Sequence, residues 1–179
     1  MLGVLKLGVT SFIAYAFWFI LPAYVANGSP VILAKILRKR HPMDFGAKFI
    51  DGRRVLGDSK SIEGFVFGVV TGTLTGLIEG LIVSNVVTYS WRGFLLAIGA
   101  MVGDCLGSFV KRRLGIESGR PAPILDQLTF LLFALLFAYL GGVYSITLGQ
   151  TVFLVIVTPL LHLATNALAY IARLKSVPW

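Results

Sequence analysis

Hydrophobic residues in this chain gather in five long runs, and almost all charged residues lie between them. Each run is close to the length of about 20 residues that an α-helix needs to cross a bilayer. Two of the joints, VSNVVTYS and GGVYSITLGQ, carry no charge and are short enough to be simple turns. We therefore predict an all-α membrane protein in which residues 1–179 form a single integral membrane domain. Its five transmembrane helices are expected at about 7–26, 62–84, 91–110, 125–144 and 148–171.

Basic residues lie almost entirely on one side of this predicted bundle. Five crossings place the loops 27–61 and 111–124 and the tail after Ile171 on the same face, and these segments hold every lysine and arginine except Lys6 and Arg92. Basic residues concentrate on the cytoplasmic side of membrane proteins. We therefore predict a multi-pass protein of the cell membrane, with its N-terminus outside and its C-terminus in the cytoplasm. The first run is too long and too aromatic for a secretory signal.

The segment SPVILAKILRKRHP, residues 29–42, differs in character from the run that precedes it. Ser29 followed by Pro30 is typical of a helix start, because a capping residue precedes a proline at the first helical position. Apolar residues and a basic face follow, so we expect a separate short helix in the membrane interface. It either rests on anionic headgroups as a topology signal or helps to deliver a lipid headgroup.

Glycine recurs at every fourth position in the second and third runs. Small residues at this spacing let the backbones of neighbouring helices approach closely. We predict that these two helices use the glycines for tight packing. The residues are Gly64, Gly68, Gly72, Gly76 and Gly80 in one run, and Gly99, Gly103 and Gly107 in the other.

The composition agrees with a membrane protein and removes several other classes. Hydrophobic residues make up 56% of the chain and charged residues 13%, whereas soluble domains carry about 25% charge. The single cysteine, Cys105, excludes an internal disulfide and a cysteine-cluster metal site. The net charge of +8 is explained by the topology signals and by phosphate binding, and no nucleic-acid-binding module is recognisable. We therefore expect no nucleic acid partner. The sequence leaves the oligomeric state open.

Asp104 is a carboxylate inside the third hydrophobic run, where an ionised side chain is costly and usually functional. Ser108 and Lys111 follow at i+4 and i+7, which places them on the same helix face. Asp126 opens the fourth run, across a short loop. Two interpretations are open: a structural ion-pair cluster, or a Mg²⁺-type site in which a few carboxylates hold the ion and phosphate oxygens complete its shell. We favour the metal site.

Other polar residues at membrane depth receive no chemistry from the sequence. Polar groups along the fifth run are compatible with packing as well as with function. Glu79, in the second run, is expected to interact with a neighbouring helix or with the interface. The residues without an assigned role are Asn27, Glu79, His162 and Asn166, with Thr158 and Thr165 near the last two.

The sequence GDSKSIEG, residues 57–64, combines glycine, hydroxyl and charged side chains immediately before the second run. Glycine-rich turns expose backbone N–H groups, which bind phosphate together with nearby basic side chains. No Walker pattern is present, so this is not a P-loop NTPase. The loop supplies six candidate binding-site residues: Gly57, Asp58, Ser59, Lys60, Ser61 and Glu63.

Two motifs resemble those of a known enzyme family. GDSKSIEGF, residues 57–65, followed by Gly68, is similar to the Lys-Thr-Trp-Glu-Gly signature of CTP-dependent phosphatidate cytidylyltransferases, with Ser61 for threonine and Ile62 for tryptophan. GDCLGSFVKRRLGI, residues 103–116, with Asp126, is similar to their C-terminal signature. The segment RPAPILDQL lacks the His-Gly-Gly of the bacterial enzymes and reads Asp-Gln where they have Asp-Arg. The short chain and five spans look most like the archaeal branch, the CDP-archaeol synthases.

This resemblance implies a Mg²⁺-dependent CTP:phospholipid cytidylyltransferase. The phosphate of an isoprenoid ether lipid, unsaturated archaetidic acid (digeranylgeranylglyceryl phosphate), would attack the α-phosphorus of CTP and release pyrophosphate, giving CDP-archaeol. Such a transfer needs mainly charge neutralisation and in-line positioning. Asp104 and Asp126 would hold the metal. Lys111, Arg112 and Lys60 would bind phosphates.

The resemblance suggests secondary roles for further residues. Neutral donors would be Ser59, Ser61 and Ser108. Asp58 and Glu63 are candidates for metal binding, base orientation or loop organisation. The ribose or cytosine of CTP would be read by Asp51, Arg53 and Arg54.

The predicted bundle would enclose a polar cavity that faces the cytoplasm, and lipid tails would reach it through a lateral gap between helices. Two rival functions stay open. A small transporter or channel would use Asp104 for gating or binding, but the chain shows no internal repeat. A phosphotransferase that consumes CDP-lipids would need more than the single Asp-Gly pair found at residues 51–52.

Overall fold

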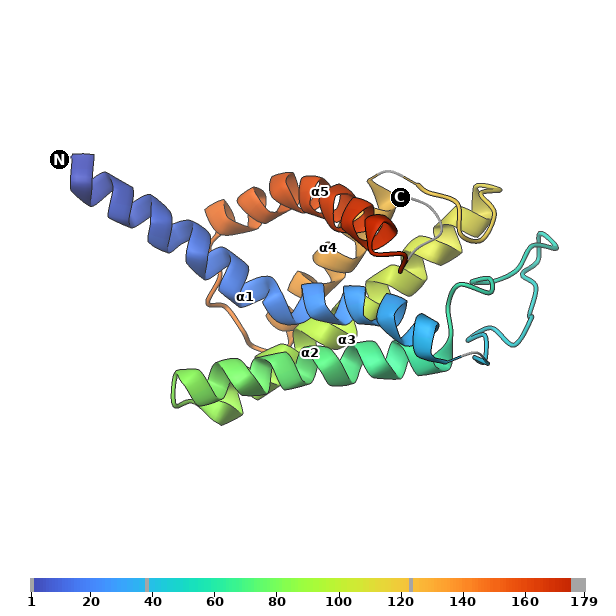
Figure 1. Cartoon of the computed structure of the whole chain (residues 1–179), viewed down its shortest axis with the longest axis horizontal. Helices are drawn as coiled ribbons and strands as arrows, with labels where there is room; N and C mark the ends of the chain where they lie inside the picture. The colour runs from blue at the N-terminus through green and yellow to red at the C-terminus, as the bar shows by residue number, and fades with distance from the viewer. Residues whose placement is uncertain (1, 38, 123, 175–179) are drawn as a thin grey trace.

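The computed structural model describes residues 2–37, 39–122 and 124–174 and shows an all-helical protein (Figure 1). Arg38 and Lys175, two of the basic residues used to orient the chain, lie outside these ranges. Within them, β-type pairing is limited to two isolated bridges in the first long loop. The helices are α1 (Leu2–Ile36), α2 (Ile62–Ile82), α3 (Val86–Arg113), α4 (Leu125–Leu140) and α5 (Leu148–Ile171).

The five predicted helices are present, with different lengths at several ends. α3 begins five residues earlier than predicted, because residues 83–85 suffice for the turn from α2: Ser84 adopts a φ of 55° and the Asn85 N–H donates to the Gly80 carbonyl. α4 stops at Leu140, because Gly141 and Gly142 follow and Gly142 takes a φ of 82°. α4 therefore has 16 residues, and the other four helices are long and apolar enough to cross a membrane.

The separate interfacial helix expected at 29–42 is wrong, because α1 continues without a break to Ile36. The first long loop accordingly begins after Ile36 and not at residue 27. Pro30 cannot donate to the Ala26 carbonyl, which would normally end the regular hydrogen bonding of a helix. The Ser29 hydroxyl donates to that carbonyl instead, at 3.3 Å. Such local replacement is how membrane helices tolerate proline.

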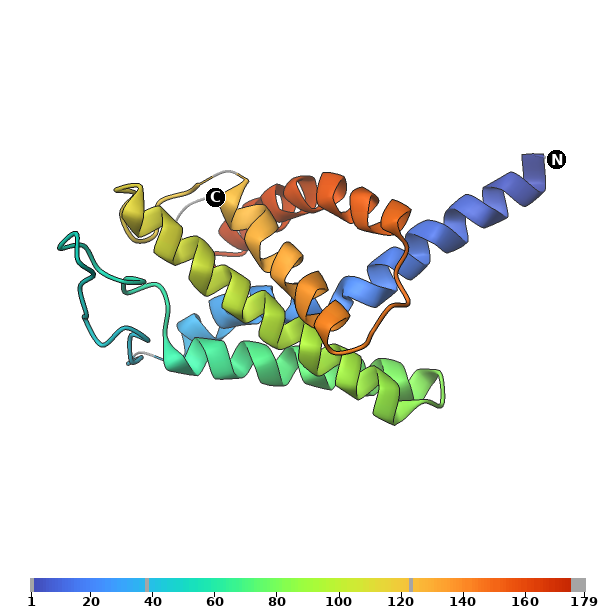
Figure 2. The same ribbon diagram turned by 180° about the vertical axis from the view of Figure 1, so that it is seen from behind.

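The predicted role of the glycine stripes in packing is confirmed by the structure. α2 lies along α1 and α3, and α3 along α4 (Figure 2). A Cβ atom added at Gly72 would lie 2.6 Å from the Ala97 Cβ and 2.7 Å from the Pro22 carbonyl oxygen. A Cβ added at Gly99 would lie 2.8 Å from the Ala134 Cα. These distances are below van der Waals contact, so the helices can approach this closely only with glycine.

α5 is packed much more loosely than α3. Of the most hydrophobic window of each helix, 11% is buried in α5 and 56% in α3. The N-terminal half of α5 rests on α1, where the Phe153 ring contacts those of Phe12 and Phe17. Beyond Thr158 no described residue of α5 is buried. The C-terminal half of α5 therefore flanks a space that α1, α3 and α4 do not fill.

Glu79 interacts with a neighbouring helix, as expected. Its carboxylate accepts from Arg92 of α3 at 2.6 Å, and the side chains are 2% and 4% exposed. The guanidinium also lies over the rings of Tyr89 (4.1 Å) and Phe19 (5.3 Å). Arg92 was one of two basic residues on the predicted outer side. Its charge is compensated within the protein, which sharpens the charge asymmetry between the two ends of the bundle.

Candidate active site

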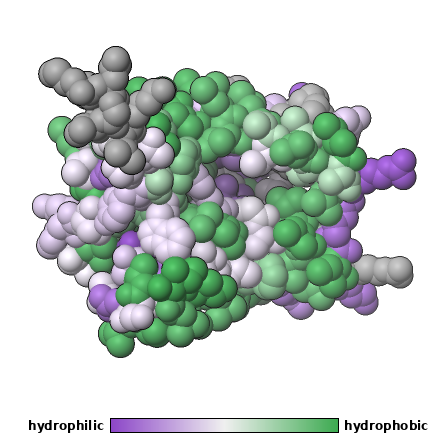
Figure 3. Space-filling view, turned by 60° about the vertical axis from the view of Figure 1, so that its left-hand side comes forward, coloured by the Kyte–Doolittle hydropathy of each residue, from purple (hydrophilic) through white to green (hydrophobic). Residues whose placement is uncertain are grey.

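A cavity of about 1150 Å³ lies among α1, α3, α4, α5 and the start of α2. The space-filling view shows a hollow in which polar side chains are seen between hydrophobic surfaces (Figure 3). Apolar side chains line one part of it, including Phe17, Val25 and Phe130. Its cationic lining comprises Lys35, Arg40, Lys60, Lys111, Arg112 and Arg120, and its acidic lining, among the described residues, Asp104 and Asp126.

Asp104 faces this cavity from α3, as do Ser108 and Lys111, which confirms the shared helix face expected from their spacing. The Lys60 ammonium donates to Asp104 at 2.5 Å. Both side chains are partly exposed, at 25% for Asp104 and 20% for Lys60. The pair joins residues 57–61, the GDSKS loop, to the C-terminal half of α3, so the costly carboxylate has a counter-charge and access to the cavity.

Asp126 forms a second pair with a lysine. The Lys111 ammonium donates to both carboxylate oxygens, at 2.9 and 3.1 Å, and the Ala122 N–H donates to the same carboxylate at 2.8 Å. Asp126 lies in the first turn of α4, where the helix dipole stabilises a negative charge. Two carboxylate–lysine pairs, built from the loop before α2, from α3 and from α4, therefore line one cavity.

Arg112 adds a buried positive charge behind Lys111. Its side chain donates to the Glu117 carbonyl at 2.9 Å, and the residue is 6% exposed. Its Nε has no hydrogen-bond partner among the described residues. Arg112 also lines the cavity, so its guanidinium is a candidate ligand for an anion bound there.

Hydrogen bonds fix the GDSKS loop where it meets α2. Ser61 is the N-cap of α2 and accepts from the Gly64 N–H at 3.1 Å, so its hydroxyl is used to start the helix. Glu63 accepts from the backbone N–H and the ring Nδ1 of His41. The Ser59 N–H donates to the Ser118 hydroxyl at 3.2 Å. These bonds fix the backbone on both sides of Lys60 and direct its ammonium to Asp104.

Asp44 organises this loop, and the sequence reasoning missed it. Its side chain is 1% exposed and accepts two bonds from Arg54 and one each from the N–H groups of Gly46, Leu56 and Gly57. The Arg54 guanidinium, with these N–H donors, holds the pKa of the Asp44 carboxyl well below its usual range. The Asp-x-Gly order at 44–46 is a recognisable turn signal, but nothing local identifies Arg54 as the partner.

The residues expected to read the nucleoside lie outside the cavity lining. Asp51 accepts from Arg113 at 2.7 Å, and Arg53 donates to the carbonyls of Arg112 and Arg113 at the end of α3. Basic side chains at a helix C-terminus commonly satisfy such carbonyls. Arg54, held by Asp44, also pairs with Asp58 at 2.9 Å. Gly57, Asp58 and Glu63 do not line the cavity either. Their binding roles stay predictions.

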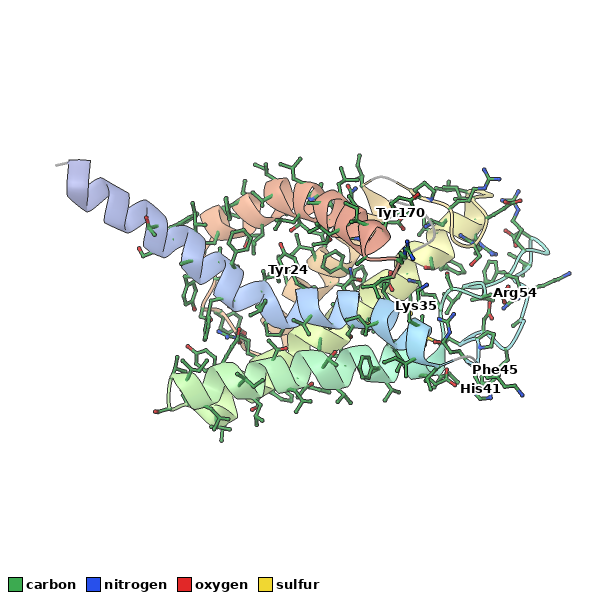
Figure 4. The ribbon with its side chains drawn as sticks, in the orientation of Figure 1. Tyr24, Lys35, His41, Phe45, Arg54 and Tyr170 are labelled. Atoms are coloured by element: carbon green, nitrogen blue, oxygen red, sulfur yellow. The ribbon has the colours of Figure 1, made fainter. Side chains whose placement is uncertain are left out.

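Polar residues of α1 and α5 complete the cavity wall. The Tyr24 hydroxyl and the Thr158 Oγ1 are 2.7 Å apart and link α1 to α5. Figure 4 shows Tyr24 in the space between these helices, and Arg54, Phe45 and His41 together in the loop at the far end. The lining also includes Asn27, His162 and Asn166. The His162 ring lies 6.3 Å from that of Phe130.

The acidic side chains of the cavity suit a magnesium ion only if a bound nucleotide supplies further ligands. No cluster of three or more histidine, cysteine or acidic side chains suited to a metal ion is found in the described part of the chain. Asp104 and Asp126 nevertheless present carboxylate oxygens to one cavity. Mg²⁺ is commonly held by one or two carboxylates together with substrate phosphates. The residues present are therefore compatible with an ion that a nucleotide helps to hold.

Comparison with known proteins gives one consistent family. Residues 9–179 match the family model for CarS-like CDP-archaeol synthase. A CDP-archaeol synthase of Pyrococcus furiosus is 51% identical over 92% of this chain and 96% of its own length. One from Methanopyrus kandleri is 48% identical, covering 90% and 91%. A solved structure of an intramembrane enzyme for archaeal membrane lipid biosynthesis is 44% identical, covers 86% of this chain and 94% of its own, and superposes with a TM-score of 0.77.

Proposed function

Because this chain belongs to the CDP-archaeol synthase family, we propose that its cavity is the site where a cytidylyl group passes from CTP to an ether-lipid phosphate. The chain is a multi-pass membrane protein and a cytidylyltransferase of archaeal lipid biosynthesis. The substrates proposed are CTP and unsaturated archaetidic acid, and the products are CDP-archaeol and pyrophosphate. The observation that carries the proposal is the pair of carboxylate–lysine contacts, Asp104–Lys60 and Asp126–Lys111, in one cavity with both charged and apolar walls.

The proposed reaction forms one P–O bond and breaks another. An ionised oxygen of the lipid phosphate attacks the α-phosphorus of CTP, and the bond from that phosphorus to the oxygen bridging it to the β-phosphate breaks. Pyrophosphate leaves with the bonding electron pair. The attacking phosphate is already ionised near neutral pH, so no strong general base is needed. The protein has to neutralise charge and align the reacting atoms.

The cationic side chains are placed to do this. Lys60 and Lys111 each carry three N–H donors, so each ammonium can bind a phosphate oxygen while it keeps its aspartate partner. Arg112, which also lines the cavity, contributes a guanidinium that can bind phosphate oxygens. Donors fixed before the reaction stabilise the charge that develops on the equatorial oxygens. Ser108 and Ser59, which line the cavity, supply neutral donors.

Asp104 and Asp126 would hold Mg²⁺ together with CTP oxygens. A bound magnesium ion would supply charge neutralisation at the α- and β-phosphates. Both carboxylates are already oriented, Asp104 by Lys60 and Asp126 by Lys111 and the Ala122 N–H. These contacts hold both carboxylates at the cavity wall.

We further propose that the cavity faces the cytoplasm, where CTP is made. The charged loops 37–61 and 114–124 lie at the end of the bundle that holds the two aspartate–lysine pairs, and the positive-inside rule places that end in the cytoplasm. The N-terminus of α1 would then lie outside in a cell membrane crossed by all five helices. α4, with 16 residues, would cross with help from α3, against which it packs closely.

The test is an assay of purified protein in detergent with labelled CTP, Mg²⁺ and the ether-lipid phosphate. CDP-lipid and pyrophosphate should form in equal amounts, and Asp104→Asn and Asp126→Asn should each lower kcat at least about 100-fold. Glu117→Gln is the control for loss of an acidic charge outside the cavity lining, because that carboxylate is 75% exposed and its ion pair among the described residues is with Arg120. Full turnover by both aspartate variants would refute the metal assignment. Absence of product with any lipid phosphate would refute the proposed reaction and favour a transporter or channel.

A further inference from the structure

α5 is divided into two halves by Thr158 and Pro159. The N-terminal half is anchored to α1 by Phe153, which contacts two rings, and by Gln150, whose side chain donates to the Phe12 carbonyl at 3.3 Å. The buried residues of α5 are Gln150, Leu154 and Thr158, all in this half. From residue 159 to 171 the helix has no buried residue, so its packing stabilises it little.

Pro159 weakens the helix at the boundary between these halves. It lies inside α5 and cannot donate to the Val155 carbonyl four residues earlier. Proline inside a helix is a common cause of bending. The loosely packed half therefore follows the point where α5 has lost a backbone hydrogen bond, and it can swing about that point while the anchored half stays in place.

The hydroxyl pair Tyr24–Thr158 lies at this same boundary. It joins α1 to α5 at 2.7 Å, next to Pro159. Beyond it the cavity lies between the two helices, with α5 contributing Leu161, His162 and Asn166. A single bond between neutral hydroxyl groups is weak enough to break and re-form during turnover, even within a membrane.

We propose that the lipid substrate enters and leaves sideways between α1 and α5, through a door formed by residues 160–171 that hinges at Pro159 and is latched by Tyr24–Thr158. This inference rests on the proposed function and specifies how the lipid reaches the site. The occupant is an isoprenoid ether-lipid phosphate. Its phosphate would meet Lys60 and Lys111, and its chains would lie along the apolar wall that includes Phe17 and Val25.

The continuity of the cavity supports this occupant. The same cavity is lined by the cationic groups at one part and by aliphatic and aromatic side chains at another, which matches an amphiphile with a charged head and apolar chains. The other helices cannot separate in the same way. α1 packs on α2, α2 on α3 and α3 on α4 through glycine contacts that are shorter than a Cβ atom would allow. α5 is the helix whose movement costs the least buried surface.

Two cysteine pairs test the door against a matched control. The first replaces Tyr24 and Thr158; the second replaces Ser29 and Thr71, a hydroxyl pair at 2.8 Å that links α1 to α2. Both are made in a Cys105→Ala background whose own activity is the reference, and are bridged by a bifunctional methanethiosulfonate that reductant removes. Activity is measured with a long-chain lipid phosphate in vesicles and with a water-soluble short-chain analogue.

Bridging positions 24 and 158 should lower turnover of the vesicle-bound lipid at least about tenfold and leave the short-chain analogue nearly unaffected, as expected for a gate. Reductant should restore the lost activity, and the α1–α2 bridge should change neither substrate's rate. Equal rates for bridged and reduced protein with the vesicle lipid would overturn the proposal. Equal losses with both substrates would also overturn it, since they would indicate damage to the site.

A second variant decides the question if the cysteine pair does not fold. Pro159→Ala restores the missing N–H and stiffens α5, so kcat/KM for the vesicle lipid should fall while KM for CTP stays unchanged. No change with the vesicle lipid would count against the hinge. If unmodified protein forms no CDP-lipid from either lipid, the proposed function itself has failed, which is distinct from any failure of the door.

Discussion

Removing the charge of Glu79 should destabilise the protein severely without touching its chemistry. In Glu79→Gln, Arg92 keeps its charge at a site where its side chain is 4% exposed, and no other acidic side chain pairs with it in the described structure. Breaking a buried ion pair from one side costs about 3–5 kcal/mol. The pair lies at the end of the bundle away from the cavity and lines no part of it.

The double variant Glu79→Gln/Arg92→Met separates this charge effect from packing. It leaves no unpaired charge, so it should recover most of the loss. A remainder of about 0.5–2 kcal/mol is expected because the guanidinium contacts with Tyr89 and Phe19 are also gone.

The free energy of unfolding is measured in mixed micelles by denaturant titration, with turnover per folded molecule measured in parallel. Glu117→Gln, which breaks an exposed pair, is the control and should change stability little. The reasoning is refuted if Glu79→Gln is no less stable than Glu117→Gln, or if the double variant is as unstable as the single one. A loss of turnover per folded molecule would contradict the assignment of the pair to structure.

Three further predictions follow from the site and its supports. Lys60→Met should lower kcat about 100–1000-fold and cost less stability than Glu79→Gln, because Lys60 and the Asp104 that it leaves unpaired are both partly exposed; a steady-state assay with CTP would contradict this if only KM changed. Gly76→Ala should destabilise the α2–α3 contact, since its Cβ would lie 2.5 Å from the Tyr89 carbonyl oxygen; an unchanged unfolding midpoint would show that the helices can separate freely. The lowered pKa of Asp44 means that its stabilising contribution is complete above the ordinary aspartate pKa of about 4 and is lost as pH falls towards the folded-state value. The unfolding midpoint of Asp44→Asn should therefore be lower than that of the unmodified chain at pH 6 and should converge with it under acid conditions, and parallel curves would refute this.

Local periodicity carried much of the prediction and also produced its main error. The length of each hydrophobic run gave five helices, and the spacing of Asp104, Ser108 and Lys111 gave their common face, because both depend only on helix geometry. The same local rules suggested a break at Ser29–Pro30. The break is absent because the Ser29 hydroxyl donates to the carbonyl that Pro30 leaves free, an exchange that a Ser-Pro pair in the sequence does not by itself indicate.

The candidate site could be predicted as a set of residues but not as a set of pairs. Lys60 and Asp104 are 44 positions apart, and many other basic residues of the loops were equally plausible partners. Asp44 was missed for the same reason, since its importance comes from Arg54 and from N–H groups up to 13 positions away. Arg53 and Asp51 were expected at the nucleotide, whereas their side chains bind the last turn of α3.

The sequence by itself determined the all-helical membrane class, the charge asymmetry of the two ends, the tight glycine contacts and the family to which the chain belongs. Each of these follows from composition, from a repeat of three or four residues, or from short motifs. Only the tertiary structure decided which lysine meets which aspartate, that Asp44 anchors the loop, and that α5 is the loosely held wall of the cavity. Those features depend on how segments far apart in the sequence pack together. The burial and the partners of a side chain are set by these distant segments, and a local sequence pattern carries no information about them.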